Sequence, residues 1–413
     1  MTDSICEVRA GFIPLIDCAP LVVARELGFA EQEGIHLRLS RETSWATIRD
    51  RLAVSHIDVA HILAPMPVAA NLGLGPLQTE MLVPMALGTG ANSVTVSHEL
   101  WQALSPHMDA ADFDAANALN ALSHVVRDRE ARSQQRLTLG VVHPYSAHHY
   151  ELAYWLASAG LIPGAMIDLV VVPPPLMPAA LASGQIDGFC AGEPWGTVAA
   201  AEGNGVILTT NAQIWRNSPE KVLGVRRDWA ESQSDGVSRL IRALYRAAEW
   251  CDAEGNQEQL AEILADERYV GERVERIRPC LARSLKSADG ASLTVEGFLN
   301  FASKAATFPW TSHALWFYSQ MVRWGQVEHS AQRAELARGT YRPDLYRLAL
   351  EPMGIELPSA NAKVEGALRS ETPAGSRLGQ LRLGPDTFFD GQVFDPEQLE
   401  AYLAGFKAKD SQW

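Results

Sequence analysis

GFIPLIDCAPLVVARELG, residues 11–28, contains the end of an apolar strand followed by a helix that stops at Gly28. The flanking sequence then predicts, in order, a strand over 35–39, a helix opened by Thr43 or Ser44, an extended segment over 56–60 and a closing turn over 64–67. Strands and helices that alternate in this way are typical of an α/β unit.

Residues 137–195 follow the same order. They predict a strand that ends at Gly140, a helix over 147–159, a strand over 169–172, a helix over 176–183, a strand over 185–189 and a turn over 192–195. Gly11 and Asp58 are 47 positions apart, as are Gly140 and Asp187. A further 7 positions separate Asp58 from Pro65 and Asp187 from Pro194. The equal spacings indicate one half-fold written twice, although a chance match of a few Gly, Asp and Pro residues would look similar.

Two such units predict two α/β lobes, each with a mostly parallel sheet. A ligand in such sheets binds at the carboxyl ends of the strands, next to helix N-termini, so two facing lobes would share one cleft. We expect residues 1–90 and 210–335 to form lobe 1 and residues 91–209 to form lobe 2. The Pro- and Gly-rich residues 336–413 are expected to wrap around the outside of both lobes.

The composition is that of an acidic globular protein. The 413 residues carry a formal net charge of −14, with 47% hydrophobic and 20% charged residues. A surface that binds nucleic acid needs an excess of Lys and Arg, so direct contact with nucleic acid is not expected. A small anion remains possible, because one site can be locally positive within an acidic protein.

The N-terminal residues predict a cytoplasmic protein. Residues 1–9 have no basic region, no apolar core and no small-residue cleavage site, and no run of about 18 apolar residues could span a membrane. The cysteines are odd in number, widely spaced and without a C-x-x-C pair, which favours a reducing compartment. They are Cys6, Cys18, Cys190, Cys251 and Cys280.

Two candidate ligand residues lie in the first third of the chain. Trp45 falls in the first turn of its helix, where an apolar side chain need not point into the core; packing under the preceding loop is as probable on spacing alone. Asn92 follows Gly88-Thr89-Gly90-Ala91 and offers both a donor and an acceptor. A turn-forming asparagine would explain that position equally well.

Four more candidates lie further along the chain. If Ser146 caps its helix, His148 takes the second helical position, near free backbone N–H groups, and could donate to an anion; an ordinary surface histidine is the alternative. Lys221 is the only lysine between Met1 and Arg227, which makes it the candidate for a buried positive charge. His149 and Glu193 are possible supporting residues, and Glu193 would have to hold a Lys or His in place to be useful near an anion.

No catalytic motif stands out. The chain has no G-x-x-x-x-G-K-[ST], no G-x-S-x-G, no H-E-x-x-H and no zinc-type spacing of Cys and His. These absences favour a binding protein over an enzyme, with no cofactor and no metal.

Six motifs together resemble the nitrate- and bicarbonate-binding proteins of ABC transporters. They are Gly11–Pro20, Ser44–Asp50, Ala60–Pro67, Val171–Pro175, Phe189–Trp195 and Pro219–Gly224. The resemblance covers about residues 8 to 330 and implies the type II periplasmic-binding-protein fold, two α/β lobes with a ligand cleft between them.

The resemblance also implies the ligand. The nitrate contacts of that family fall by motif on Trp45, Asn92, His148 and Lys221. The family's amide donor is a Gln, so Asn92 is a shorter substitute. The motif position does not decide between His148 and the adjacent His149 as the histidine contact. The bicarbonate-binding members carry an acidic residue where this chain has Lys221 and use calcium with it. Lys221 therefore favours nitrate or nitrite, because a desolvated monoanion needs a positive partner.

The expected cytoplasmic location matches the NasS-type nitrate/nitrite sensors, which are similar to the transport proteins. By that resemblance, the chain would hold an RNA-binding antiterminator protein of the NasT type until the anion binds, and so regulate nitrate-assimilation genes. One alternative is the substrate-binding component of a nitrate ABC transporter. Another is an enzyme of similar fold acting on thiamine-pyrimidine precursors, which would need a reactive group such as Cys190 in the cleft.

Overall fold

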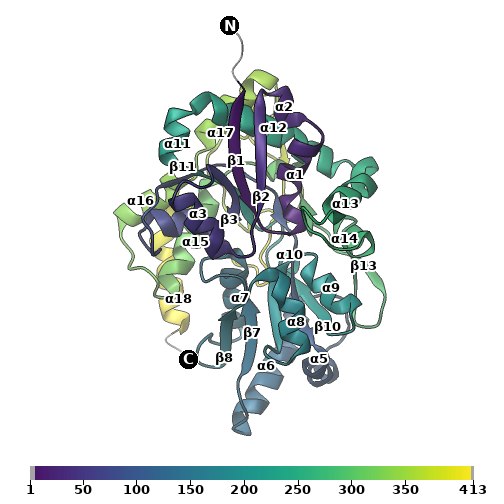
Figure 1. Ribbon diagram of the computed structural model, residues 1–413. Coiled ribbons are helices and arrows are strands. Elements are labelled where there is room, and N and C mark those ends of the chain that lie inside the picture. Colours follow the sequence, from purple (N-terminus) through teal and green to yellow (C-terminus); the bar gives the residue numbers. More distant parts are fainter. Residues whose placement is uncertain (1–4, 411–413) are drawn as a thin grey trace.

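The computed structural model describes residues 5–410, with residues 407–410 described only in their backbone. Figure 1 shows two lobes, one above the other, with the N-terminal strands in the upper lobe. The α/β class with two lobes, predicted from the sequence, is confirmed. Each lobe contains one five-stranded sheet.

The first sheet has the order β2-β1-β3-β11-β4. Its strands are β1 (Cys6–Phe12), β2 (Ile35–Arg41), β3 (Val59–Leu63), β4 (Met81–Ala86) and β11 (Lys221–Arg226). β1, β2 and β3 are parallel, whereas β11 runs antiparallel to both β3 and β4. The sheet therefore takes four strands from the start of the chain and one from its middle.

The second sheet repeats this plan with the order β8-β7-β9-β6-β10. Its strands are β6 (Asn92–Ser97), β7 (Leu137–Val141), β8 (Ile167–Val171), β9 (Gly188–Gly192) and β10 (Gly205–Thr210). β7, β8 and β9 are parallel, and β6 runs antiparallel to β9 and β10. All five strands come from one continuous part of the chain.

The equal spacings of the sequence correspond to equal geometry. Gly11 pairs with Ala60 across β1 and β3, and Gly140 pairs with Phe189 across β7 and β9. In both lobes an aspartate lies one position before a strand, β3 or β9, and accepts a backbone hydrogen bond from the neighbouring strand, β1 or β7. The Arg9 amide donates to Asp58 over 3.0 Å, and the Thr138 amide donates to Asp187 over 2.7 Å.

Two local expectations were wrong. The third strands start at Val59 and Gly188, about three residues later than predicted, because Asp58 and Asp187 belong to the turns that precede them. The segment 64–67 is not a closing turn, because helix α4 starts at Pro65, whereas the turn predicted over 192–195 is present at Glu193 and Pro194 and leads directly into α9. A proline in the first turn of α4 fits this role, since its fixed φ suits a helix start.

Helices cover both sheets and fill the connections. Before β6 they are α1 (Ala19–Glu26), α2 (Phe29–Gln32), α3 (Trp45–Ala53) and α4 (Pro65–Asn71). Between β6 and β11 they are α5 (His98–Leu104), α6 (Ala115–Ala131), α7 (Ala147–Ser158), α8 (Met177–Ala182), α9 (Trp195–Ala201) and α10 (Asn211–Ile214). After β11 they are α11 (Arg227–Ser232), α12 (Ser234–Asp252), α13 (Gln257–Ala265), α14 (Val274–Leu281), α15 (Thr311–Arg323), α16 (Ala331–Thr340), α17 (Pro343–Leu350) and α18 (Leu399–Asp410).

Small two-stranded ladders complete the fold, and the first of these joins distant parts of the chain. β5 (Thr89–Gly90) pairs with β14 (Leu299–Asn300), β12 (Ser284–Lys286) with β13 (Ser292–Thr294), and β15 (Thr372–Pro373) with β16 (Arg382–Leu383). Among residues 5–410, no helix has both the length and the apolar character needed to cross a membrane.

The C-terminal segment contacts both lobes. The Tyr341 hydroxyl donates to the Ala64 carbonyl oxygen of the first lobe over 3.0 Å. The Asp390 carboxylate accepts from the Tyr154 hydroxyl on α7 of the second lobe, with both oxygens at 2.9 Å.

Candidate functional site

Lys221 is the first residue of β11 and lies where the first sheet meets the second lobe. Its ammonium group is buried, with 1% of the residue exposed. The Nζ atom donates to Asp17 Oδ2 over 2.8 Å and to Glu220 Oε1 over 2.6 Å. Asp17 in turn lies 2.8 Å from Nε2 of His61, the central residue of β3. A positive charge that is taken out of water in this way needs such partners.

Trp45 lies beside this lysine. Ser44 caps α3 by accepting a hydrogen bond from the Thr47 amide over 3.2 Å, and Trp45 is the first residue of the helix. The Lys221 ammonium lies 5.5 Å from the centre of the indole ring, within reach of a cation–π contact. The indole Nε1 is buried and has no hydrogen-bond partner in the described part of the chain. A buried N–H group without a partner is rare and marks a place where a ligand could accept a bond.

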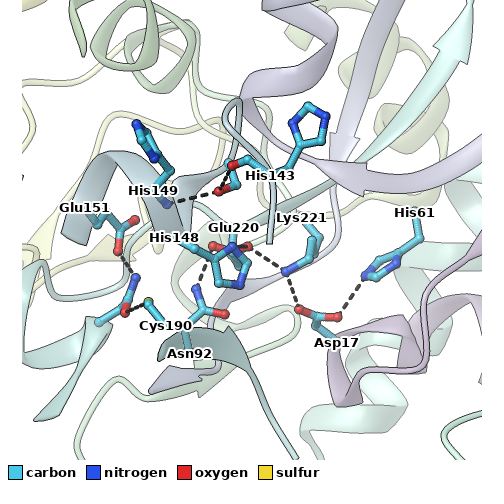
Figure 2. A network of polar contacts seen from close by, with 12 residues as sticks. Asp17, His61, Asn92, His143, His148, His149, Glu151, Cys190, Glu220 and Lys221 are labelled. Carbon is cyan, nitrogen blue, oxygen red and sulfur yellow. Dashed lines mark hydrogen bonds and ion pairs between the residues drawn. The ribbon is translucent and has the colours of Figure 1, made fainter. Parts of the chain in front are cut away.

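The second lobe contributes Asn92 and His148, and both converge on the Glu220 carboxylate (Figure 2). Asn92, the first residue of β6, donates through Nδ2 to Glu220 Oε2 over 2.6 Å. His148 Nδ1 lies 3.2 Å from Glu220 Oε1, although its direction does not make a good hydrogen bond. Both side chains are fully buried. The structure therefore brings Lys221, Asn92 and His148 to one carboxylate, and Trp45 lies beside Lys221.

The start of α7 explains the position of His148. Ser146 caps this helix, since its Oγ accepts from the His149 amide over 3.0 Å, and it also donates to the His143 carbonyl oxygen over 2.7 Å. His148 therefore takes the second helical position, as predicted from the sequence. His149 is turned away from the Glu220 carboxylate in Figure 2 and packs edge-on against Tyr150.

Glu193 lies next to the donor set but does not contact Lys221 or His148. Its carboxylate accepts from the Ser93 hydroxyl over 2.5 Å and from the Thr197 amide over 2.9 Å. Because Ser93 follows Asn92 directly, these bonds fix the start of β6.

Two acidic residues of the site were not anticipated from the sequence. Asp17 and Glu220 both contact the Lys221 ammonium group, and Glu220 is its immediate neighbour in the chain. Carboxylates are unexpected beside an anion site, so residue type gave no reason to select them. A buried lysine in an acidic protein does require a counter-charge, and that requirement was the available signal.

Burial and ion pairing have opposite effects on the pKa values of the site. Desolvation alone would lower the pKa of Lys221, but attraction to Asp17 and Glu220 outweighs it and raises that pKa. Burial likewise raises the pKa of Glu220, although Lys221 and Asn92 oppose this effect. The pKa of His148 is lowered well below its usual value, by burial first and by the nearby Lys221 second, so its ring is neutral.

A second buried network lies behind this site. The Asn211 amide donates to Glu151 on α7, and the Cys190 thiol donates to Asn211 Oδ1 over 3.4 Å. Burial raises the pKa of the Cys190 thiol well above its usual value, and Glu151 and Glu220 add to this effect. The thiol form of cysteine is a poor nucleophile, so Cys190 is unsuited to catalysis.

Comparison with known proteins yields consistent matches. A family model described as "NMT1-like family" matches residues 5–265. The nitrate/nitrite binding protein NrtA of Synechococcus elongatus is 32% identical over 413 residues, covering 97% of this chain and 86% of that protein. The bicarbonate transport ATP-binding protein CmpC of the same species is 32% identical over 96% of this chain, which spans 54% of that protein.

A solved structure matches the fold over almost the whole chain. The periplasmic nitrate-binding protein NrtA from Synechocystis superposes with a TM-score of 0.84 at 27% identity, covering 97% of this chain and 98% of that one.

Proposed function

The chain belongs to the NMT1-like family, and we propose that it binds nitrate or nitrite between its two lobes. The observation that carries this proposal is the convergence of buried donors from both lobes on one carboxylate: Lys221 from the first lobe, Asn92 and His148 from the second. A carboxylate and a nitrate ion are both planar and carry one negative charge. A donor set that accommodates the first suits the second in charge and shape.

Lys221 favours nitrate and nitrite over bicarbonate. It is the positively charged member of the converging donors, and its raised pKa keeps it protonated at neutral pH. The resemblance described above gives bicarbonate-binding members an acidic residue at this position together with calcium. A lysine there would repel a calcium ion and attract an anion directly.

Calorimetric titration tests this proposal. The purified protein is titrated with nitrate, with nitrite and with bicarbonate, the last with and without calcium. Saturable heat with nitrate or nitrite alone is the expected result. Binding of bicarbonate only in the presence of calcium would contradict the role given to Lys221. Absence of heat with all three ions would instead favour the alternative of an enzyme with a similar fold.

The finer proposal is a cytoplasmic sensor. The five cysteines lie in the described part of the chain as free thiols, four of them buried, which is usual in a reducing compartment. The net charge of −14 suits contact with a basic RNA-binding protein better than contact with RNA. In this role the chain holds an antiterminator protein of the NasT type and releases it when the anion closes the lobes, because closure changes the surface offered to the partner.

A pull-down distinguishes this role from transport. The sensor hypothesis predicts that the chain retains a NasT-type protein without nitrate and releases it when nitrate or nitrite is added. Chloride is the control salt. The alternative is the substrate-binding component of a nitrate ABC transporter, which the names of the relatives favour. Export of the full-length protein from the cytoplasm, measured by cell fractionation, would support that alternative and exclude the sensor.

A further inference from the structure

The Glu220 carboxylate occupies the centre of the donor set. Its Oε1 accepts from Lys221 Nζ and its Oε2 accepts from Asn92 Nδ2, each over 2.6 Å. His148 Nδ1 lies 3.2 Å from Oε1. Glu220 precedes β11 of the first lobe, whereas Asn92 and His148 belong to the second lobe. Its side chain therefore connects the two lobes in the way that a bound anion would.

Two buried ring nitrogens of the site have no hydrogen-bond partner in the described part of the chain. These are Trp45 Nε1 and His148 Nε2. A carboxylate has two oxygens, whereas nitrate has three. The unused N–H donor of the indole, and that of the imidazole in the matching tautomer, are therefore available to an external oxyanion.

The charges of the site do not allow a second anion as they stand. Among the residues that the structure describes, Lys221 is the one cation in contact with Glu220, and Asp17 contacts the same ammonium group over 2.8 Å. Burial would raise the pKa of Asp17, but Lys221 and His61 reverse this and hold it well below the usual range, so Asp17 is ionised. With Glu220 also ionised, Asp17, Glu220 and Lys221 carry one net negative charge. An arriving anion would then meet like charge in a buried site.

We infer that Glu220 is an internal anion held in the ligand position, and that an external monoanion binds there together with one proton that neutralises Glu220. This inference rests on the proposed function. The proton comes from solvent and forms an O–H bond on the carboxylate, which then changes from an acceptor that competes for donors into a donor toward the anion. Nitrate stays ionised throughout, so the charge of the site is the same before and after binding.

Several properties of the site support Glu220 as the group that takes up the proton. It is 2% exposed, and burial raises its pKa, which brings the neutral form closer to physiological pH. The ionisable groups that influence it are Asp17, His148, Glu151, Cys190, Lys221 and Tyr341. Of these, Asp17 and Lys221 hold their charges, and burial keeps His148, Cys190 and Tyr341 neutral.

Glu151 is the remaining group that could take up a proton. Burial raises its pKa well above the usual value, and repulsion from Glu220 adds to this effect. Its carboxylate accepts from the Asn211 amide, and the Lys221 ammonium group donates to Asp17 and Glu220 instead, so Glu151 provides a matched control.

The test is calorimetric titration with nitrate between pH 6 and pH 8, in buffers of different ionisation enthalpy, which reports the number of protons bound. For the wild-type protein we expect uptake of about one proton and a Kd that rises about tenfold per pH unit above the pKa of Glu220. Glu220→Gln, which keeps the shape and removes the charge, should bind nitrate at least about tenfold tighter at pH 8. Its Kd should change less than about twofold over the pH range. Glu151→Gln should keep the wild-type proton uptake.

The outcomes separate the two proposals. Nitrate binding without proton uptake, or a Glu220→Gln variant that binds no tighter than wild type at pH 8, would overturn the inference and leave the proposed function intact. Loss of proton uptake in Glu151→Gln but not in Glu220→Gln would also overturn it. If neither nitrate nor nitrite binds to wild type or variant at any pH, the proposed function fails and this inference with it. If Glu220→Gln does not fold, the proton count of the wild-type protein together with that of Glu151→Gln decides the question.

Discussion

At the residue scale, Lys221 has a structural role besides the ligand contact proposed for it. Its ammonium group neutralises two carboxylates that are themselves buried, Asp17 and Glu220. Removing one partner of a buried ion pair leaves uncompensated charge, which costs more than the pair contributes. The importance of Lys221 for stability therefore follows from its neighbours.

We predict that Lys221→Met lowers the free energy of unfolding by about 3–5 kcal/mol at neutral pH. Urea denaturation followed by circular dichroism measures this change. The sequence alone does not predict this cost, because the two carboxylate partners of Lys221 could not be identified there. Adding Asp17→Asn to Lys221→Met should recover part of the loss. A single variant as stable as wild type would show that the carboxylates become protonated at little cost.

The two adjacent histidines provide a matched pair. His148 faces the Glu220 carboxylate, whereas His149 packs against Tyr150. We predict that His148→Gln weakens nitrate binding at least about tenfold, since it alters a buried donor of the site, while His149→Gln changes the Kd by less than about threefold. Calorimetry on both variants at one pH checks this. Equal losses in the two variants would contradict the assignment of His148 to the site.

Residue type was enough to select some of these positions but not others. Lys221 stands out in the sequence because it is the first lysine of the chain, and Ser146 predicts the helix start that positions His148. Asp17 and Glu220 could not be selected, because the reason for their presence is a charge balance that depends on three-dimensional contact.

At the element scale, the crossing between the lobes depends on a short ladder. Gly90 in β5 has a φ of +76°, and a Cβ atom built there would lie 2.1 Å from the Phe298 carbonyl oxygen next to β14. Gly73 has nearly the same φ, +74°, but a Cβ atom there would meet nothing within 4 Å.

We predict that Gly90→Ala lowers the free energy of unfolding by about 3 kcal/mol, through backbone strain and a clash that only a shift of β14 could relieve. Gly73→Ala should cost only about 1 kcal/mol, because strain acts there alone. Urea denaturation of both variants measures the difference. Similar costs at the two positions would mean that the β5–β14 contact yields without penalty.

The elements show where local patterns were sufficient. The parallel strands and their helices follow from apolar periodicity and from the matched spacings of Gly11 with Asp58 and Gly140 with Asp187. The strand starts were placed too early, since an aspartate that accepts backbone hydrogen bonds can belong to a turn as well as to a strand. The antiparallel positions of β6 and β11 depend on contacts between distant segments and were not visible locally.

At the scale of the whole molecule, a ligand that contacts both lobes should stabilise the folded chain as a unit. We predict that nitrate at about 100 times its Kd raises the free energy of unfolding by about 2.7 kcal/mol. Urea denaturation with nitrate, and with chloride at equal ionic strength as the control, measures this effect. Lys221→Met should show no such increase. Equal stabilisation by chloride would indicate a general salt effect and not binding at the site.

The unequal division of the chain between the two sheets has a consequence for synthesis on the ribosome. The second sheet is complete once residue 210 has left the exit tunnel. The first sheet lacks β11, the last of its strands to be synthesised, until residue 226 has emerged. The four strands of the first sheet that are made early must therefore wait, with β3 and β4 unjoined, while the later-made lobe can already fold. Since Lys221 and Glu220 arrive with that last strand, the nascent chain can form the proposed anion site only when the two lobes are joined.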